Sequence, residues 1–187
     1  MRIVGGQWRG RPIASPPPDA PIRPTTDRAR ETLFNVLAHD PGAAIEGAAV
    51  LDLFAGTGAL GFEALSRGAK RCLFVDQGAP ARALIRQTID RLGCGGVARL
   101  HKRDATKLGP AGPVGAHDLV FLDPPYGRGL GEGALASARE GGWIASGATV
   151  VWEEAHNAGT AWPDGFEARG ERRVGDTVFR FGRAAAA

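Results

Sequence analysis

Apolar segments typical of β-strands alternate with helical segments along most of this 187-residue chain. Two of the helical segments, 58–68 and 80–93, close on a glycine, as many helices do at their carboxyl ends. Strands that alternate with helices form a parallel sheet with helices on both faces. The sequence therefore predicts an α/β fold with strands at 48–54, 71–76, 97–102, 117–123 and 149–154.

The carboxyl-terminal segment has a different pattern. Residues 166–174 and 177–183 are two further strand candidates, and Gly175 and Asp176 join them. A two-residue connection of this kind is typical of a β-hairpin. The hairpin is predicted to add an antiparallel strand at the edge of a mostly parallel sheet.

Residues 1–24 are predicted to be a small arm that precedes a main domain of residues 25–187. The arm looks like a short hairpin over 2–15, and the prolines of 16–24 favour an extended linker. The main domain begins with an amphipathic helix within 25–40. Its apolar residues recur at helical spacing, with Thr26 or Asp27 available as N-cap: Ala29, Leu33, Val36 and Leu37.

Composition favours one domain with one core, since 43% of the residues are hydrophobic. The two cysteines stand in no disulfide or redox motif, and the four histidines have no metal-ligand spacing. We therefore expect a reducing, cytoplasmic location and no metal. The chain shows no signal peptide and no long apolar run, so no membrane partner is expected.

Positive charge is concentrated near the beginning of the chain. The net charge is only +3, but residues 1–30 carry six arginines against two aspartates. This end is the candidate surface for phosphate groups, although arginines scattered over a solvated surface would give the same count. The six are Arg2, Arg9, Arg11, Arg23, Arg28 and Arg30.

A glycine-rich turn follows the first strand of the main domain. Gly56, Gly58 and Gly61 have the spacing of a dinucleotide-binding turn, and an acid, Asp76, follows at the expected separation. The glycines could also serve a tight turn alone. In parallel sheets, ligands lie beyond the carboxyl ends of the strands. Because Asp76 can accept both hydroxyls of a ribose there, the sequence predicts a cofactor that contains adenosine.

The segment "DPPYG", residues 123–127, follows the fourth strand. Two prolines remove two backbone donors and stiffen the chain, so the nearby carbonyls are fixed as acceptors. Asp123 and the carbonyls of Asp123 or Pro124 can accept the hydrogens of an exocyclic amine, while Tyr126 stacks on a planar base. Pro125 completes the predicted site.

These motifs resemble those of S-adenosylmethionine-dependent methyltransferases that act on exocyclic amines. The segments "RIVGGQWRGR", "IRPTTDRARETLFNVL" and "LDLFAGTGALGFEALSRGA" are similar, more narrowly, to the bacterial 16S ribosomal RNA guanine-N2 methyltransferases of the RsmD type. The resemblance implies a Rossmann-like class I fold with a seven-stranded sheet. It also implies S-adenosylmethionine as cofactor, and that cofactor carries a sulfonium and no pyrophosphate.

The resemblance implies a role for each motif residue. Asp123, Pro124, Pro125 and Tyr126 hold the target amine. The cofactor lies against Gly56 and Gly58 through their backbone and beside Phe54. Asp52 meets its methionine end, Asp76 its ribose, and Asp104 with Ala105 its adenine. Arg9, Arg11 and Arg23 are expected to contact the RNA backbone.

The expected activity is methylation of the N2 amine of a guanine in 16S ribosomal RNA. The substrate is either naked RNA or the assembled or assembling small subunit, and the enzyme is expected to be a monomer. The motifs leave three alternatives: an adenine-N6 methyltransferase, an NAD-dependent oxidoreductase, and an inactive RNA-binding assembly factor.

Overall fold

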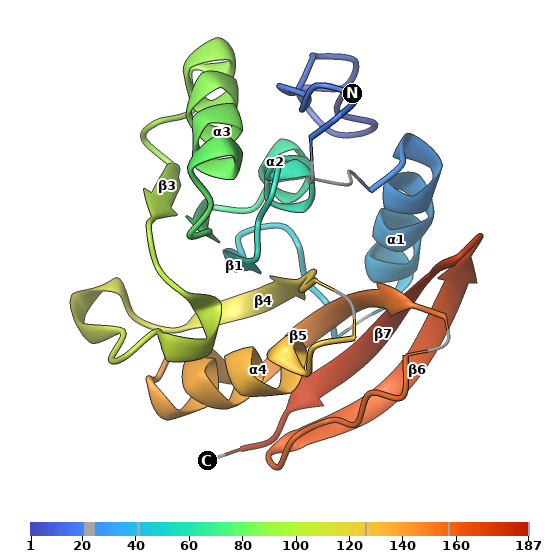
Figure 1. The fold of residues 1–187 in the computed structure, drawn as a ribbon, viewed down its shortest axis with the longest axis vertical. Coiled ribbons are helices and arrows are strands. Elements are labelled where there is room, and N and C mark those ends of the chain that lie inside the picture. The colour runs from blue at the N-terminus through green and yellow to red at the C-terminus, as the bar shows by residue number, and fades with distance from the viewer. Residues whose placement is uncertain (21–24, 41, 126, 157, 187) are drawn as a thin grey trace.

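A computed structural model describes the chain except residues 21–24, 41, 126, 157 and 187. The described residues contain seven strands in one sheet, in the order β3-β2-β1-β4-β5-β7-β6 (Figure 1). The first five strands pair in parallel, and β7 is antiparallel to both of its neighbours. The bounds are β1 (Ala49–Leu53), β2 (Arg71–Val75), β3 (Ala98–His101), β4 (His117–Leu122), β5 (Ile144–Ala155), β6 (Phe166–Val174) and β7 (Thr177–Ala184).

This architecture confirms the predicted mostly parallel seven-stranded sheet with an antiparallel edge hairpin. The hairpin contributes both of its strands, since β7 lies between β5 and β6. β5 begins five residues before the predicted strand, at Ile144 rather than at 149.

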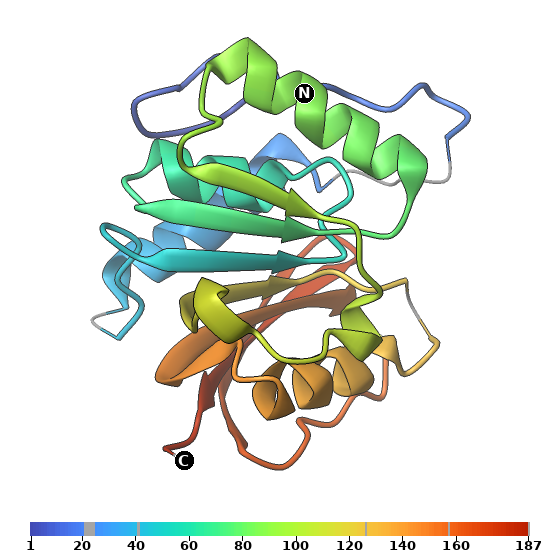
Figure 2. The ribbon, with the colours of Figure 1, turned by 90° about the vertical axis from the view of Figure 1, so that its left-hand side faces the viewer.

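Helices cover both faces of the sheet (Figures 1 and 2). One core layer lies between the sheet and α1, α2 and α3, and the other lies between the sheet and α4. The helices are α1 (Asp27–His39), α2 (Ala59–Ser66), α3 (Ala79–Leu92) and α4 (Leu130–Glu140), with short 3-10 turns at Ala105–Lys107 and Gly112–Val114. The sequence predicted α1, α2 and α3. It did not predict α4, whose Gly131 and Gly133 lower the helical propensity of the segment.

The amino end of α1 resolves the choice between two predicted caps. The Thr26 hydroxyl accepts a hydrogen bond from the backbone N–H of Ala29, so Thr26 is the N-cap. The residue before it, Thr25, is thereby placed at the end of the sheet where the parallel strands finish, and it lines the cavity described below.

The arm is part of the core rather than an appendage beside it. Ile3 and Ile13 are buried in the same layer as α1 and α2. Hydrogen bonds from Ile3 N to Arg11 O and from Ile13 N to Met1 O pair the two sides, around an Arg2–Pro12 bridge. The arm therefore contributes two buried side chains to the core layer under α1 and α2.

A buried ion pair joins the arm to the helices. Glu63 of α2 is fully buried and accepts a hydrogen bond of 2.9 Å from Val4 N. It also pairs with Arg67 at 3.0 Å and with the buried Arg30 of α1 at 3.6 Å. Arg30 in turn donates to the carbonyl of Arg2. Arg30 therefore stabilises the protein internally and does not face phosphate, in contrast to the expectation for this group of arginines.

Candidate functional site

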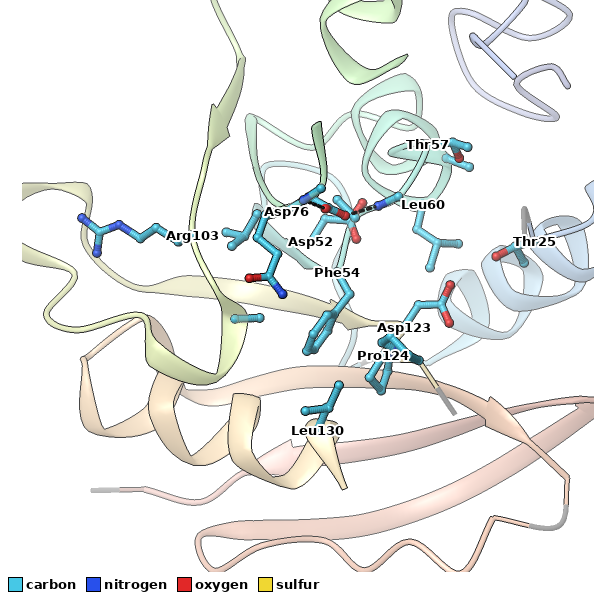
Figure 3. A pocket seen from close by; sticks show the side chains of 18 of the residues that line it. Thr25, Asp52, Phe54, Thr57, Leu60, Asp76, Arg103, Asp123, Pro124 and Leu130 are labelled. Carbon is cyan, nitrogen blue, oxygen red and sulfur yellow. Dashed lines mark hydrogen bonds between the residues drawn. The ribbon is translucent and has the colours of Figure 1, made fainter. Parts of the chain in front are cut away.

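A cavity of about 490 Å³ lies at the carboxyl ends of β1, β2 and β4 (Figure 3). This is the edge of the sheet at which the sequence predicts a ligand. The structure brings eight of the predicted site residues together around it: Asp52, Phe54, Gly56, Asp76, Ala105, Asp123, Pro124 and Pro125. Gly58 and Asp104 do not line the cavity, and Tyr126 and Arg23 lie outside the described residues.

The glycine turn brings backbone close to the cavity. Phe54, Gly56 and Gly58 all have positive φ angles, of 55°, 57° and 75°. For Phe54 this is a strained conformation, which is characteristic of functional sites. A Cβ atom on Gly58 would lie 2.7 Å from the Phe62 ring, and one on Gly61 would lie 2.3 Å from the Phe74 ring. Gly58 and Gly61 therefore allow α2 to pack on the sheet, whereas Gly56 is the glycine of the motif that lines the cavity.

Asp76 fixes two turns of backbone at the cavity wall. Its Oδ2 atom accepts a hydrogen bond of 2.9 Å from Gly56 N, and its Oδ1 atom accepts one of 2.7 Å from Gly78 N. Each carboxylate oxygen can accept more than one hydrogen bond. The carboxylate is therefore oriented and still able to accept two hydroxyl groups, which suits the vicinal hydroxyls of a ribose.

Asp52 is buried on β1, below the glycine turn. Its Oδ2 atom accepts a hydrogen bond of 3.1 Å from Gly61 N. Burial raises the pKa of Asp52 well above its ordinary range, despite the opposing effect of the Gly61 N–H. The residue thus ties the first turn of α2 to β1 and presents a carboxyl group to the cavity.

Asp104 caps a short turn, whereas the next residue, Ala105, lines the cavity. Its Oδ1 atom accepts hydrogen bonds from both the N–H and the hydroxyl of Thr106, and these bonds hold the pKa of Asp104 below its ordinary value. Asp104 thereby caps the 3-10 turn that carries the buried Ala105 to the cavity. Its predicted contact with adenine remains a prediction.

Asp123 follows β4 directly and lines the cavity beside the buried Pro124. Burial raises the pKa of Asp123 well above its ordinary range, and the nearby carboxyls of Glu153, Asp52 and Glu154 raise it further. A carboxyl with this environment is a functional-site candidate in its own right.

Several residues of the site were not predicted from the sequence. Thr25, Gln77, Arg103 and Arg128 line the cavity, and the buried Glu153 accepts a hydrogen bond of 2.8 Å from the Thr25 hydroxyl. The signal for Glu153 was present, since "WEE" places acids at the end of an apolar strand.

The two described arginines of the predicted RNA contact lie away from the cavity. Arg11 donates to the carbonyl of Arg91, near the carboxyl end of α3, and Gln7 N donates to the carbonyl of Ser66, the last residue of α2. Both helices begin at the cavity and end here, on the side where the strand arrows start in Figure 2. Arg9 is exposed on the same loop. Their contact with RNA remains a prediction.

With this geometry in place, comparisons with known proteins identify the family. The model of the family described as Conserved hypothetical protein 95 matches residues 1–183. The chain belongs to this family. The predicted resemblance to the RsmD type is confirmed by this match together with relatives that are named Ribosomal RNA small subunit methyltransferase D.

Relatives of known name agree with this assignment. A protein of Escherichia coli (strain K12) named Ribosomal RNA small subunit methyltransferase D is 38% identical over 182 residues, which cover 96% of this chain and 88% of that protein. A protein of Haemophilus influenzae with the same name is 33% identical and covers 96% of this chain and 92% of its own length.

Solved structures confirm the Rossmann-like class I fold. A methyltransferase structure from Escherichia coli has a TM-score of 0.81 at 36% identity and covers 100% of this chain and 99% of its own. A methylase structure from Haemophilus influenzae has a TM-score of 0.78 at 30% identity, with the same coverage. This family membership does not support the oxidoreductase alternative. No group of His, Cys, Asp or Glu in the described part of the chain could hold a metal, and no described helix is long and apolar enough to cross a membrane.

Proposed function

We propose that this protein methylates the exocyclic N2 amine of a guanine in 16S ribosomal RNA, with S-adenosylmethionine as methyl donor. The observation that carries the proposal is the position of Asp123 and Pro124 beside the Asp76 turn, in one cavity. The relatives named Ribosomal RNA small subunit methyltransferase D support the choice of RNA. The proposal includes action by a cytoplasmic monomer on the assembled or assembling subunit.

The residues of the cavity fit the proposed cofactor. Asp76 has acceptor capacity for the ribose hydroxyls, and Gly56 lets the cofactor approach the backbone closely. Asp52 and Ala105 both line the cavity, and we assign them to the methionine end and to the adenine of the cofactor. When bound, S-adenosylmethionine supplies an electrophilic methyl group on a sulfonium.

The protein's contribution to the reaction is mainly the orientation of the amine. Asp123 and the carbonyls next to the two prolines accept hydrogen bonds from the amino group, which directs the nitrogen lone pair toward the methyl group. The target base must be extruded or unpaired to reach this cavity. Tyr126 is the proposed stacking partner of the base.

The direct test is methyl transfer from labelled S-adenosylmethionine to small subunits, or to naked 16S RNA, from a strain that lacks this protein. Mass spectrometry of the nucleosides should find N2-methylguanosine. N6-methyladenosine would favour the adenine alternative, and the absence of any methylated nucleoside from both substrates would contradict the proposal.

Replacement of Asp123 tests the chemistry. Asp123→Ala should reduce the single-turnover rate by about 10²-fold, the scale of one lost preorganised partner in a transition state. S-adenosylhomocysteine should bind as to the wild type in calorimetry, since Asp123 is assigned to the amine. Asp90→Ala, an exposed change on α3, is the matched control. If the single-turnover rate falls by only a few-fold, far less than the loss of a preorganised group would cause, Asp123 does not align the amine.

A further inference from the structure

Three acidic residues point to the same face of the sheet beneath the cavity. Side chains alternate between faces along a strand. Leu51, Leu53, Leu122 and Trp152 belong to the core layer of α4, whereas Val50, Phe121 and Val151 belong to the layer of α1 and α2. Asp52, Asp123 and Glu153 are therefore directed to the α1–α2 side.

The strand register places Glu153 beside Asp123. Leu122 of β4 is opposite Trp152 of β5 in the parallel pairing. The residues that follow them, Asp123 and Glu153, are therefore lateral neighbours. Adjacent strands lie about 4.8 Å apart. Asp52 is on β1, the other neighbour of β4.

Among the residues that the structure describes, no cation forms an ion pair with Glu153. Glu153 is 4% exposed. Asp123 lies beside it directly after β4, and the uncharged Phe179 is opposite it on β7. The hydroxyl of Thr25, before α1, donates to Glu153 Oε2 at 2.8 Å. None of the ion pairs between described residues includes Asp52, Asp123 or Glu153. Like charges this close cannot all be ionised, so the pair retains a proton.

We propose that Glu153 and Asp123 form a proton-sharing pair that takes up the proton lost by the target amine, and that Thr25 positions Glu153. The proposal rests on the proposed function, because it assumes that an amine is the methyl acceptor. Glu153 is a positioning residue, since it acts through Asp123 and does not line the cavity.

The step balances with the groups already named. The amine nitrogen forms a bond to the methyl carbon while the carbon–sulfur bond of the cofactor breaks, and that electron pair stays on sulfur. The nitrogen then carries one proton too many and transfers it to the ionised carboxylate of Asp123. The pair binds one proton before the reaction and therefore carries one negative charge, which either carboxyl can hold. Asp123 accepts the amine proton when it holds that charge. The proton leaves to water after the product has dissociated.

Titration of the cofactor-free protein tests the pair directly. The Asp123 carboxyl is followed by carbon NMR over pH. Glu153→Gln keeps the acceptor for Thr25 but cannot ionise, so the pKa of Asp123 should fall, since the Glu153 charge is the main electrostatic cause that raises it after burial. Thr25→Val removes the donor that favours ionised Glu153, so the pKa of Glu153 should rise. Glu154→Gln is the matched control, because Glu154 alternates to the opposite face and affects Asp123 least.

Kinetics provide the second readout. In Glu153→Gln the acid limb of the single-turnover rate should move to lower pH, and the plateau should fall by about 10-fold, less than the roughly 10² of a complete general base, because Asp123 remains. If Glu153→Gln changes neither the pKa of Asp123 nor the acid limb of the rate, the two carboxyls do not share a proton and the proposal is wrong. If the wild type methylates no guanine, the proposed function fails, whereas the NMR titration still decides whether the two carboxyls share a proton.

Discussion

At the residue scale, Asp76 connects two turns that are far apart in sequence. It accepts the N–H groups of Gly56, 20 residues earlier, and of Gly78, two residues later. The glycine turn after β1 and the start of α3 are therefore held by one carboxylate. This arrangement explains why an acid at the end of β2 matters even before any ligand is considered.

Asp76→Ala should weaken S-adenosylmethionine binding by roughly 1.5–3 kcal/mol, the scale of hydrogen bonds to a charged acceptor. The reason is the loss of the proposed ribose contacts together with the two backbone anchors. Calorimetry measures the affinity, with Asp90→Ala at the far end of α3 as control. Equal affinities of Asp76→Ala and the wild type would refute the ribose assignment.

Glu153 makes stability depend on pH in the opposite direction to most acids. Burial raises the pKa of Glu153 from 4.5 to about 7. Because the folded state binds this proton more tightly than the unfolded state, the contribution to stability is fully present below pH 4.5 and is lost as pH rises through 7.

Between pH 5 and 8, we therefore expect the wild type to lose on the order of 2–3 kcal/mol of unfolding free energy through Glu153. Glu153→Gln should not lose this part, since glutamine does not titrate. Urea unfolding at a series of pH values measures the difference. Parallel curves for the two proteins would show that Glu153 has an ordinary pKa.

At the scale of elements, Glu63 determines how the arm docks. One buried carboxylate of α2 contacts Val4 of the arm, Arg30 of α1 and Arg67 after α2. The sequence motifs at the beginning of the chain and in α1 thus have a structural function, because they meet at the same side chain.

Glu63→Ala should destabilise the protein by roughly 3–5 kcal/mol, the cost of removing one partner of a buried ion pair. It leaves Arg30, which is fully buried, without its acid on α2. Urea unfolding measures the loss, and limited proteolysis should show faster cleavage of the arm. Glu167→Ala, which breaks an exposed pair with Arg169, should change stability little. If both variants unfold like the wild type, the docking role is wrong.

At the scale of the whole molecule, the arm and the cavity lie at opposite ends of α3. Arg11 contacts the carboxyl end of α3, and Gly78 at its amino end lines the cavity. The helix has 14 residues, and a rise of about 1.5 Å per residue gives about 21 Å between these ends. An RNA held by both sites must therefore extend along one side of the protein.

Changing Arg9, Arg11 and Arg23 to alanine together should weaken RNA binding. Its salt dependence should flatten by about 0.7 log units per lost phosphate contact, while cofactor affinity stays unchanged because the three arginines are assigned to the RNA backbone and not to the cofactor. Tyr126→Ala should instead cost roughly 1–3 kcal/mol of stacking with the same salt slope. RNA titrations at several salt concentrations separate the two effects. A triple variant with the wild-type slope would assign RNA recognition to another surface.

The sequence by itself determined the features that depend on neighbouring residues. Strand periodicity, the start of α1 near Thr26 and Asp27, the glycine turn and the prolines after β4 each depend on a few neighbouring residues, so they could be predicted from local sequence. The rule that ligands lie beyond parallel strands then placed Asp52, Asp76 and Asp123 together, and the cavity confirms that placement.

Only the tertiary structure decided which of these residues face the cavity and what else meets them. Asp104 turns to Thr106, Arg30 is buried against Glu63, and Glu153 lies beside Asp123. The contact of Asp104 with Thr106 is local, whereas the other two outcomes depend on helix docking or strand register between segments distant in sequence. Such contacts form because burial leaves a polar group no water to bind, so it must find whichever partner the fold brings near.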